Sequence, residues 1–384
     1  MSRLRVFHAI TMLELGGAQR NTLDTVARLD RRRFEVALAC ADRGELLEEA
    51  RALPATSLFP LRHLRREVNP PADLLAWWEL RRAIRTFQPH LVHTHSSKAG
   101  ILGRAAARAE GVPLVVHSIH GFGFGPHQHP LVRRAFQATE RRAAAWTTAF
   151  IAVSRANLEE GLGLGLFTRE KVHLIRSGID LAAFRQAAGG EAVRAELGIP
   201  ATAPLVVQVA CFKPQKAPER FVELARRVVE RVPSAYFLLV GDGERRPILE
   251  RQRDAAGLSG RLLLPGWRRD IPALLAAATV LTLTSRFEGL PRAVVEALAA
   301  GVPVVAMAVD GVGEVVRDGI NGFLVAEGDV ETQATRVAAI LTDPQLREAL
   351  ARRAGEGLEA FDREVMVAQQ EALYLELACR RGLC

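Results

Sequence analysis

A chain of 384 residues is too long for one ordinary core and suits two domains of roughly 150 to 200 residues each. Its hydrophobic content of 49% can fill two cores, and no apolar run reaches the ~18 residues that a membrane span needs. The four cysteines (Cys40, Cys211, Cys379 and Cys384) are too few for a disulfide framework and lack metal-ligand spacing, which indicates a reducing, cytoplasmic setting.

The net charge of +8 is concentrated in the first half of the chain. Residues 1–183 hold 26 lysines and arginines against 17 acidic residues, a net of +9, whereas the remainder holds 25 against 26, a net of −1. Basic clusters at 31–33, 62–67 and 81–85 predict an anionic acceptor or an acidic membrane face, or else a solvated arginine-rich surface. No aromatic residues interleave with these clusters and no binding motif accompanies them, which argues against nucleic acid as a partner.

Strand-like apolar runs alternate with amphipathic helical stretches along the chain, which predicts parallel sheets with helices on both faces. The start, RLRVFHAI, is typical of a first strand and not of a signal peptide. In the first half we expect strands at 5–10, 35–40, 91–96, 113–120 and 149–154, with helices such as 19–29 and 73–87 between them. In the second half we expect strands at 204–210, 235–241, 261–266, 279–284, 303–307 and 322–325.

This pattern predicts an α/β protein of two doubly wound, parallel-sheet domains, at 1–183 and 204–360. The stretch 184–203, with its glycine pair, polar residues and prolines, predicts a linker. A final helix in 361–384 has apolar positions near helical spacing and would pack back on the first domain. In such sheets ligands lie outside the carboxyl ends of the strands, so we expect the active site where two such edges face each other.

Lysine is rare in this chain, which has four lysines against 47 arginines. Two of the four, Lys213 and Lys216, stand in VACFKPQKAP (209–218), directly after a predicted strand. A compact ammonium suits a small polyanion, whereas a guanidinium forks onto a flat carboxylate. We therefore expect a phosphate site here.

A second candidate site lies in TSRFEGLPRAVVEALAAGVPVVA (284–306). A strand ends near Thr284, and Pro291 suits the first helical position because it has no amide hydrogen to leave unpaired. The helix that follows opens with free backbone amides, which form an anion site. Glu288 can accept hydrogen bonds from sugar hydroxyls or from a helix cap. Glu296 has apolar neighbours, so its charge needs a partner, either ribose hydroxyls or an arginine.

These residues resemble the family 4 glycosyltransferases of the GT-B fold, whose signature is two glutamates separated by seven residues, as Glu288 and Glu296 are. The resemblance covers nearly the whole chain, through LGGAQR, HGFGF, SGID, GDGERRPILE, PGWRRDIPALLAAA and DGVGEVVRDGINGFLV in this order. It implies two facing Rossmann-like domains, the second of which holds a nucleotide-diphosphate sugar. The implied reaction is sugar transfer with retention of configuration.

The resemblance also implies roles for single residues around the diphosphate and the sugar. Glu288 would hold donor-sugar hydroxyls, and Glu296 would hold the ribose. The turn of Gly289, Leu290 and Pro291 would present amides to the diphosphate.

Two glycine pairs and their neighbours complete the implied donor site. Gly266 and Trp267 match the place where the family contacts the base. Gly16 and Gly17 would let the backbone approach the donor phosphate, since no side chain blocks it.

The lysine stretch departs from the family pattern, which usually has an arginine and then a lysine followed by glycine. Cys211 stands at the arginine's place and Ala217 at the glycine's, while Lys216 matches the lysine. Lys213 is the obvious substitute charge, or else it lies in solvent. Both cations of the family pattern neutralise the diphosphate leaving group.

Six histidines raise the question of a metal site: His93, His95, His117, His120, His127 and His129. Ligation needs a matched geometry and second shell, and the resemblance implies no metal for donor binding. We expect no metal and no cofactor, the nucleotide-sugar being a co-substrate. His120 matches the family histidine that hydrogen-bonds the sugar and helps to stabilise positive charge near the reacting carbon. With Glu288 and Lys216, it completes the predicted catalytic set.

The stretch 91–124 looks most like bacterial members that build surface polysaccharides. That likeness implies a glycan or lipid-linked acceptor at the cytoplasmic membrane face, and a uridine nucleotide is the favoured donor. The alternatives are a nucleotide-sugar 2-epimerase, for which no acid–base pair is evident, and a non-catalytic partner protein, which Cys211 alone favours. A nicotinamide oxidoreductase is a further alternative, but the expected G-x-G-x-x-G after a first strand is absent.

Overall fold

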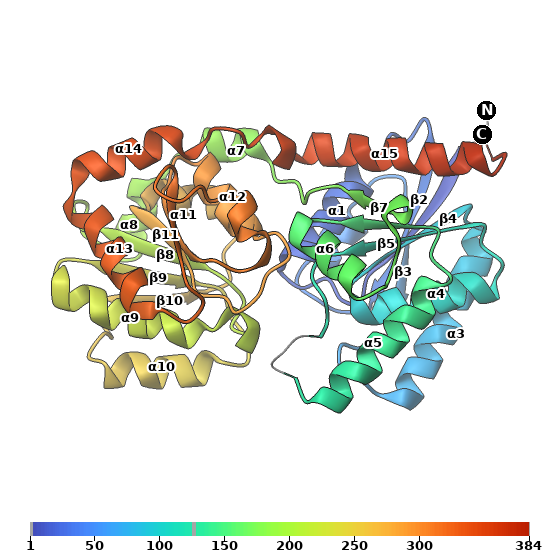
Figure 1. The fold of residues 1–384 in the computed structure, drawn as a ribbon, viewed down its shortest axis with the longest axis horizontal. Coiled ribbons are helices and arrows are strands. Elements are labelled where there is room, and N and C mark those ends of the chain that lie inside the picture. Colours follow the sequence, from blue (N-terminus) through green and yellow to red (C-terminus); the bar gives the residue numbers. More distant parts are fainter. Residues whose placement is uncertain (1–2, 125–127, 384) are drawn as a thin grey trace. The chain divides into compact units, whose positions relative to one another are not determined.

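The computed structural model describes residues 3–124 and 128–383, and it divides the chain into two compact units. One unit runs up to Gly178 and includes the C-terminal segment from Arg363, whereas the other spans Ile179–Asp362. Each unit is built on one parallel sheet (Figure 1). His127 and Cys384 lie outside the described residues.

The sheet of the first unit has seven strands in the order β3-β2-β1-β4-β5-β6-β7. The strands are β1 (Leu4–Ala9), β2 (Phe34–Ala41), β3 (Thr56–Leu61), β4 (Leu91–His95), β5 (Leu114–Ile119), β6 (Ala149–Ala152) and β7 (Val172–Leu174). The five strands predicted in the first half are confirmed, and the sheet adds β3 and β7. Strand order reverses between β1 and β4, which makes the carboxyl ends of these two strands the place where a doubly wound sheet binds ligands.

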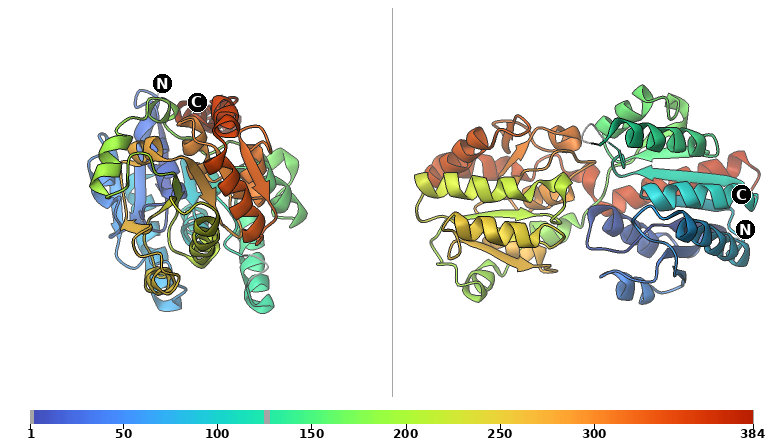
Figure 2. Two further views of the ribbon diagram at one scale, coloured as in Figure 1. Left: turned by 90° about the vertical axis from the view of Figure 1, so that its left-hand side faces the viewer. Right: turned by 90° about the horizontal axis from the view of Figure 1, so that it is seen from below.

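Helices cover both faces of this sheet (Figure 2). They are α1 (Gly17–Arg28), α2 (Leu47–Arg51), α3 (Pro70–Phe87), α4 (Ser97–Ala109), α5 (Pro130–Ala144), α6 (Arg155–Gly163) and α15 (Arg363–Arg380). Successive residues of a strand point to opposite faces, so β1 serves two cores. Leu4 and Val6 lie in the cluster that contains residues of α1 and α15, whereas Phe7 and Ala9 lie in the cluster formed with α3 and α4.

The last helix, α15, packs against α1 of the first unit, as the sequence predicts. Met366 and Tyr374 are fully buried there, and the Asn21 amide lies 3.0 Å from the Met366 sulfur. At the rim, the backbone amide of Asp30 donates to Glu371 over 2.7 Å. Within the described residues, no helix of either unit has both the length and the apolar composition to cross a membrane.

The sheet of the second unit has six strands in the order β10-β9-β8-β11-β12-β13. The strands are β8 (Leu205–Val209), β9 (Tyr236–Val240), β10 (Leu262–Gly266), β11 (Val280–Leu283), β12 (Val304–Met307) and β13 (Gly322–Val325). The helices are α7 (Leu181–Arg185), α8 (Gly190–Glu196), α9 (Pro218–Arg231), α10 (Arg246–Ala255), α11 (Ile271–Ala277), α12 (Arg292–Ala299), α13 (Val330–Thr342) and α14 (Pro344–Ala354). All six predicted strands are present, and the order reverses between β8 and β11.

The stretch 184–203, which the sequence indicates as a linker, lies within the second unit in the structure and contains α8. Val193 of this helix is buried in one cluster with Leu205 and Leu274. The Arg194 guanidinium donates to the backbone carbonyls of Ala203 and Ala277 over 2.8 and 2.7 Å. A stretch whose apolar side chain fills the core and whose cation joins neighbouring segments is part of the domain.

Candidate functional site

The switch point of the second sheet brings together two of the predicted site residues. Lys216 follows β8 and Glu288 follows β11, and these strands are neighbours. The Lys216 ammonium lies 2.6 and 2.8 Å from the two carboxylate oxygens of Glu288. The Lys216 side chain keeps 20% of its surface exposed, whereas the Glu288 side chain keeps 5%. The pair therefore sits at the rim of the site, with the lysine on its open side.

Hydrogen bonds fix the two loops that carry this pair. The buried Thr284 hydroxyl donates to the carbonyl oxygen of Lys216 over 3.0 Å and lies 2.9 Å from the side-chain nitrogen of Gln208. The Gln215 side chain donates to the carbonyl oxygen of Phe287 over 2.9 Å. Both loops are thus tied to the sheet and to each other, which preorganises the charges.

The charge state of Lys216 follows from two opposing effects. Burial lowers the pKa of the Lys216 ammonium, but the Glu288 carboxylate beside it, and then Cys211, raise it, and the net result is a pKa above the ordinary lysine value. The ammonium is therefore charged at neutral pH. Two of its three N–H groups bind Glu288, which leaves the third for a further acceptor.

Asp310 is a site residue that the sequence analysis missed. Its carboxylate accepts a hydrogen bond of 2.5 Å from the backbone amide of Glu288. Burial and the nearby Glu288 carboxylate raise the pKa of Asp310, while the Glu288 amide lowers it in part. Its φ of 39° is unusual for a residue other than glycine. An acidic residue three positions after the end of strand β12 was the available signal.

The turn into α12 differs by one residue from the prediction. Pro291 is the N-cap, with φ −76° and ψ 98°, and the helix begins at Arg292. The prediction of Pro291 as the first helical residue was therefore wrong, because its ψ is extended and only its carbonyl joins the helix, accepting from the Val294 amide over 3.0 Å. Gly289 and the buried Leu290 connect this cap to Glu288.

Glu296 lies one turn into the same helix, where the Arg292 guanidinium approaches its carboxylate to 3.8 Å. The arginine partner considered for Glu296 is therefore present. The Glu296 side chain keeps 14% of its surface exposed, which leaves room for a ligand. Gly266 ends β10 with φ 84°, a conformation that favours glycine. Trp267, which follows it, is 36% exposed.

Ala217 explains why the family prefers glycine at its position. Its φ of 44° and ψ of 52° are left-handed, and its side chain is buried. A residue with a Cβ pays about 1–2 kcal/mol for this conformation.

We expect Ala217→Gly to raise the free energy of unfolding by about 0.5–1 kcal/mol, because relief of this strain outweighs the extra entropy of the unfolded chain. Urea unfolding checks this expectation. The matched control is Ala195→Gly inside α8, which should cost about 1 kcal/mol. Equal losses in both variants would contradict the strain at Ala217.

Cys211 and Lys213 lie in the loop between β8 and the short helix Pro214–Lys216. Cys211 carries a free thiol, and its carbonyl oxygen accepts from the Lys213 amide over 2.8 Å. Both residues are partly exposed. The substitution of the family arginine by Lys213 stays a prediction.

The first unit holds the other predicted residues, again at a switch point. Gly16 is the N-cap of α1, which begins at Gly17, and its φ of −146° is one that any residue adopts. Conformation therefore does not require a glycine at position 16, where an added Cβ would meet the end of the Gln19 side chain at 2.5 Å.

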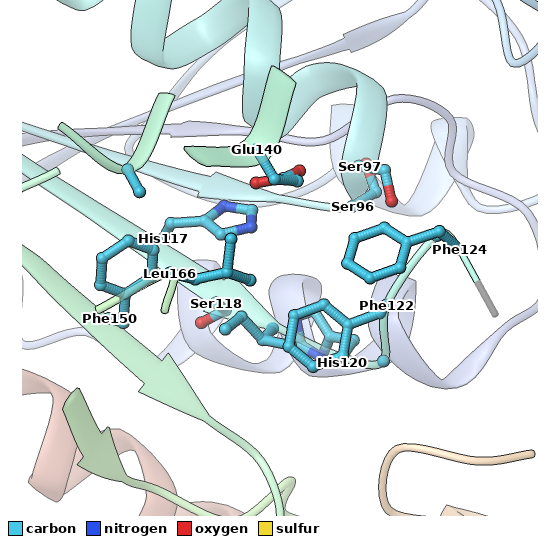
Figure 3. A pocket seen from close by; sticks show the side chains of 14 residues that line it. Ser96, Ser97, His117, Ser118, His120, Phe122, Phe124, Glu140, Phe150 and Leu166 are labelled. Atoms are coloured by element: carbon cyan, nitrogen blue, oxygen red, sulfur yellow. The ribbon is translucent and has the colours of Figure 1, made fainter. Parts of the chain in front are cut away.

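His120 directly follows β5 and lies beside a small cavity (Figure 3). His117 and Glu140 line this cavity together with Phe122 and Phe124 of the following loop. Its volume of about 20 Å³ has room for roughly one water, so it is too small for a sugar ring. The sugar contact predicted for His120 must lie outside this cavity.

The buried histidines of the first unit form one cluster. Side-chain nitrogens of His8, His93 and His95 all lie within 4.8 Å of one another. The sequence analysis named His93 and His95 but missed His8, which lies beside His93 in the register of β1 and β4. His129, by contrast, is exposed and caps α5.

Two family models match the chain, one for each half. The model for glycosyltransferase family 4 matches residues 15–183, and the model for glycosyl transferases group 1 matches residues 190–356. The UDP-Gal:alpha-D-GlcNAc-diphosphoundecaprenol alpha-1,3-galactosyltransferase of Escherichia coli is 32% identical over 349 residues, or 90% of each chain. The D-inositol 3-phosphate glycosyltransferase of Actinosynnema mirum is 30% identical over 88% of this chain and 87% of its own.

Among solved structures, that of Anabaena HepE with UDP and glucose is similar in fold, with a TM-score of 0.82, 23% identity and coverage of 97% of this chain and 100% of that one. These relatives are named as glycosyltransferases, so neither the epimerase nor a non-catalytic partner is favoured. Two matched models, a full-length relative and the paired Lys216 and Glu288 agree: this chain is a glycosyltransferase of family 4 with the GT-B fold.

Proposed function

We propose that this enzyme transfers a sugar, with retention of configuration, from a UDP-sugar to a lipid-linked glycan acceptor. The observation that carries the proposal is the fixed pair of Lys216 and Glu288 at the switch point of the second sheet. Support for the donor and acceptor comes from the name of the Escherichia coli relative, which specifies UDP-galactose and a diphosphoundecaprenol-linked sugar.

In this proposal the free N–H of Lys216 binds the diphosphate, and its charge stabilises the leaving group as the sugar–phosphate bond breaks. Lys213 adds a second charge, and the amides at the start of α12 a partial one. Because cations of the chain itself meet the diphosphate, we propose that no metal is required.

Glu288 binds donor-sugar hydroxyls in this proposal. Its carboxylate is neutralised by Lys216, which makes it a poor nucleophile. We therefore favour a front-face reaction in which the leaving phosphate helps to take the acceptor proton. His120, Gly16 and Gly17 serve the sugar and phosphate from the first unit, while Glu296, Gly266 and Trp267 hold the nucleoside.

A thermal-shift panel of nucleotides and nucleotide sugars tests the donor. A ligand at about 100 times its Kd stabilises the folded state by about 2.7 kcal/mol, which for a unit of this size raises Tm by about 5–10 °C. We expect UDP and UDP-sugars to give this shift and ADP and GDP to give less. A larger shift with GDP would overturn the choice of base, and no shift with any nucleotide would overturn the proposed function.

We further propose that the enzyme associates peripherally with the cytoplasmic face of an anionic membrane. The first unit exposes large apolar side chains on two helices that both contact α4: Leu74, Leu75 and Trp78 of α3, and Leu131 and Val132 of α5. The same helices carry Arg81, Arg85, Arg133 and Arg134. Apolar residues next to basic ones suit a surface that enters the headgroup region of acidic lipids.

Vesicle sedimentation with and without phosphatidylserine tests this surface. We expect Trp78→Glu to weaken binding to acidic vesicles at least about tenfold, since a buried large apolar side chain contributes about 1.5–3 kcal/mol. Val365→Glu, at an exposed apolar position of α15, is the matched control and should bind as the unchanged chain does. Equal binding by both variants would contradict the proposed surface.

A further inference from the structure

A chain of imidazoles leads from the core of the first unit to His120. His8 Nδ1 lies 3.1 Å from His95 Nε2, and His95 Nδ1 lies 3.2 Å from His120 Nε2. The three rings come from neighbouring segments, since β1 pairs with β4, β4 pairs with β5, and His120 directly follows β5. The fold itself therefore aligns them.

The geometry is that of in-plane hydrogen bonds. The ring planes of His8 and His95 are inclined by 15°, and those of His95 and His120 by 31°. The N–H and the lone pair of an imidazole both lie in the ring plane, so near-coplanar rings suit N–H···N bonds. Burial, assisted by Arg31, lowers the pKa of His8 to about 3, and burial lowers that of His95 well below its usual value. Each of these two rings therefore carries one proton.

Such a chain has two possible directions. If His8 donates through Nδ1–H to His95, then His95 donates through Nδ1–H to His120, whose own proton is on Nδ1. In the reverse direction each ring is protonated on Nε2, and His120 carries its proton toward His95. A neutral ring passes on only one proton, so the inner end of the chain sets the direction for all three rings.

The inner end is His8 Nε2, which is buried and has no hydrogen-bond partner in the described part of the chain. One direction leaves a lone pair unpaired there, and the reverse direction leaves an N–H unpaired. Among backbone groups, buried N–H donors without a partner are rarer than buried acceptors without one, and we apply the same order to the ring nitrogens. The first direction is therefore preferred.

We propose that the unpaired end at His8 fixes the direction of the chain, so that His120 carries its proton on Nδ1 and meets the donor sugar as a hydrogen-bond donor. The inference rests on the proposed function for the placement of His120 at the sugar. It specifies the sugar hydrogen bond that the resemblance implies for His120: the neutral ring donates through Nδ1–H. His8 and His95 are positioning residues that act through His120.

A divalent metal held by His8, His93 and His95 is the competing explanation of the cluster. His93 is already engaged on both sides, with Tyr374 Oη at 2.5 Å from Nδ1 and Ser118 Oγ at 2.8 Å from Nε2. A metal would have to break one of these bonds and one of the two bonds of His95, to His8 or to His120. The intact hydrogen bonds favour the imidazole chain.

The direct test is the tautomer of His120 in the full-length protein. Long-range ¹H–¹⁵N NMR of ¹⁵N-histidine-labelled protein distinguishes Nδ1–H from Nε2–H, and His120→Gln assigns the signal. We expect Nδ1–H at His8, His95 and His120. An Nε2–H tautomer at His120 would overturn the proposal, as would about one equivalent of zinc or nickel that purifies with the chain and is lost in His8→Leu.

Variants of His8 test the dependence on the inner end. By the same preference, His8→Leu, which leaves His95 Nε2 as the buried inner end, should keep Nδ1–H at His120. His8→Asp, whose carboxylate can only accept, should draw the His95 proton to Nε2, shift His120 toward Nε2–H and lower kcat about five- to tenfold, the effect of one lost hydrogen bond. His8→Asn, whose amide can donate near the position of Nδ1, should keep both the Nδ1–H tautomer and kcat. His117→Leu is the control, because His117 binds Thr94 and stands outside the chain. A His120 tautomer unchanged in His8→Asp would overturn the proposal.

The NMR result is independent of the donor. Nδ1–H at His120 without any nucleotide-induced shift in Tm would overturn the proposed function and leave the direction of the chain established. Nε2–H at His120 together with a nucleotide-induced shift in Tm would overturn the proposed direction of the hydrogen bonds alone.

Discussion

Lys216→Ala lowers the turnover number at least about a hundredfold, because loss of one preorganised charge at a leaving group costs roughly 3 to 4 kcal/mol. The hydrogen bonds that hold both loops keep the ammonium in place before the donor arrives. Its contribution should therefore appear in kcat more than in KM, since the charge on the diphosphate grows as the bond breaks. Steady-state kinetics with a UDP-sugar and a lipid-linked acceptor measures both constants.

The same substitution leaves Glu288 buried without its cation, and this destabilises the second unit independently of any effect on catalysis. Lys216→Ala with Glu288→Gln removes this penalty, so its Tm should recover relative to Lys216→Ala while kcat stays low. Lys171→Ala in the first unit is the control for loss of a lysine elsewhere. Near-normal turnover in folded Lys216→Ala would remove the leaving-group role.

The sheets were predictable from the sequence where strands are buried on both faces. Interior strands such as β9 and β12 are almost wholly buried and read as continuous apolar runs. The two missed strands lie at the edges of the first sheet, where β3 is mostly part-buried and contains Pro60, and β7 has three residues. Edge strands need less apolar sequence, so their signal is weak.

The site was predictable in its residues but not in their pairing. Lys216 and Glu288 are 72 positions apart, and only the adjacency of β8 and β11 brings them together. The sequence indicated both and gave no reason to pair them. Asp310 depends on a third strand end, and no local pattern marks it as the acceptor for the Glu288 amide. Contacts between loops of different strands follow from strand order, which a single sequence does not contain.

The place of His8 in the histidine cluster was likewise not predictable from the sequence. In RVFHAI it reads as one polar residue in an apolar strand, and its neighbours on β4 are found only from the register. Register turns scattered histidines into one buried cluster, and the cluster has a consequence for stability that composition does not suggest.

We expect the first unit to lose several kcal/mol of stability between pH 7 and pH 5.5. Burial lowers the pKa of His8 to about 3 and holds those of His93, His95 and His117 well below the usual value. The unfolded chain takes up protons on these rings below about pH 6.5, which the folded unit cannot do. Stability from each ring is therefore complete above this pH and falls by up to about 1.4 kcal/mol per pH unit below it.

Urea unfolding at several pH values measures this loss, and tryptophan fluorescence can report the first unit alone. Of the four tryptophans, Trp267 is the one in the second unit, so Trp267→Phe confines the signal to the first. His8→Asn should reduce the slope of the free energy of unfolding against pH by up to about 1.4 kcal/mol per pH unit, which is the contribution of one ring. His129→Gln, at an exposed position, should leave the slope unchanged. A profile that is flat from pH 7 to 5.5 would show that the buried rings accept protons without loss of the fold, and the neutral imidazole chain at His120 would lose its basis.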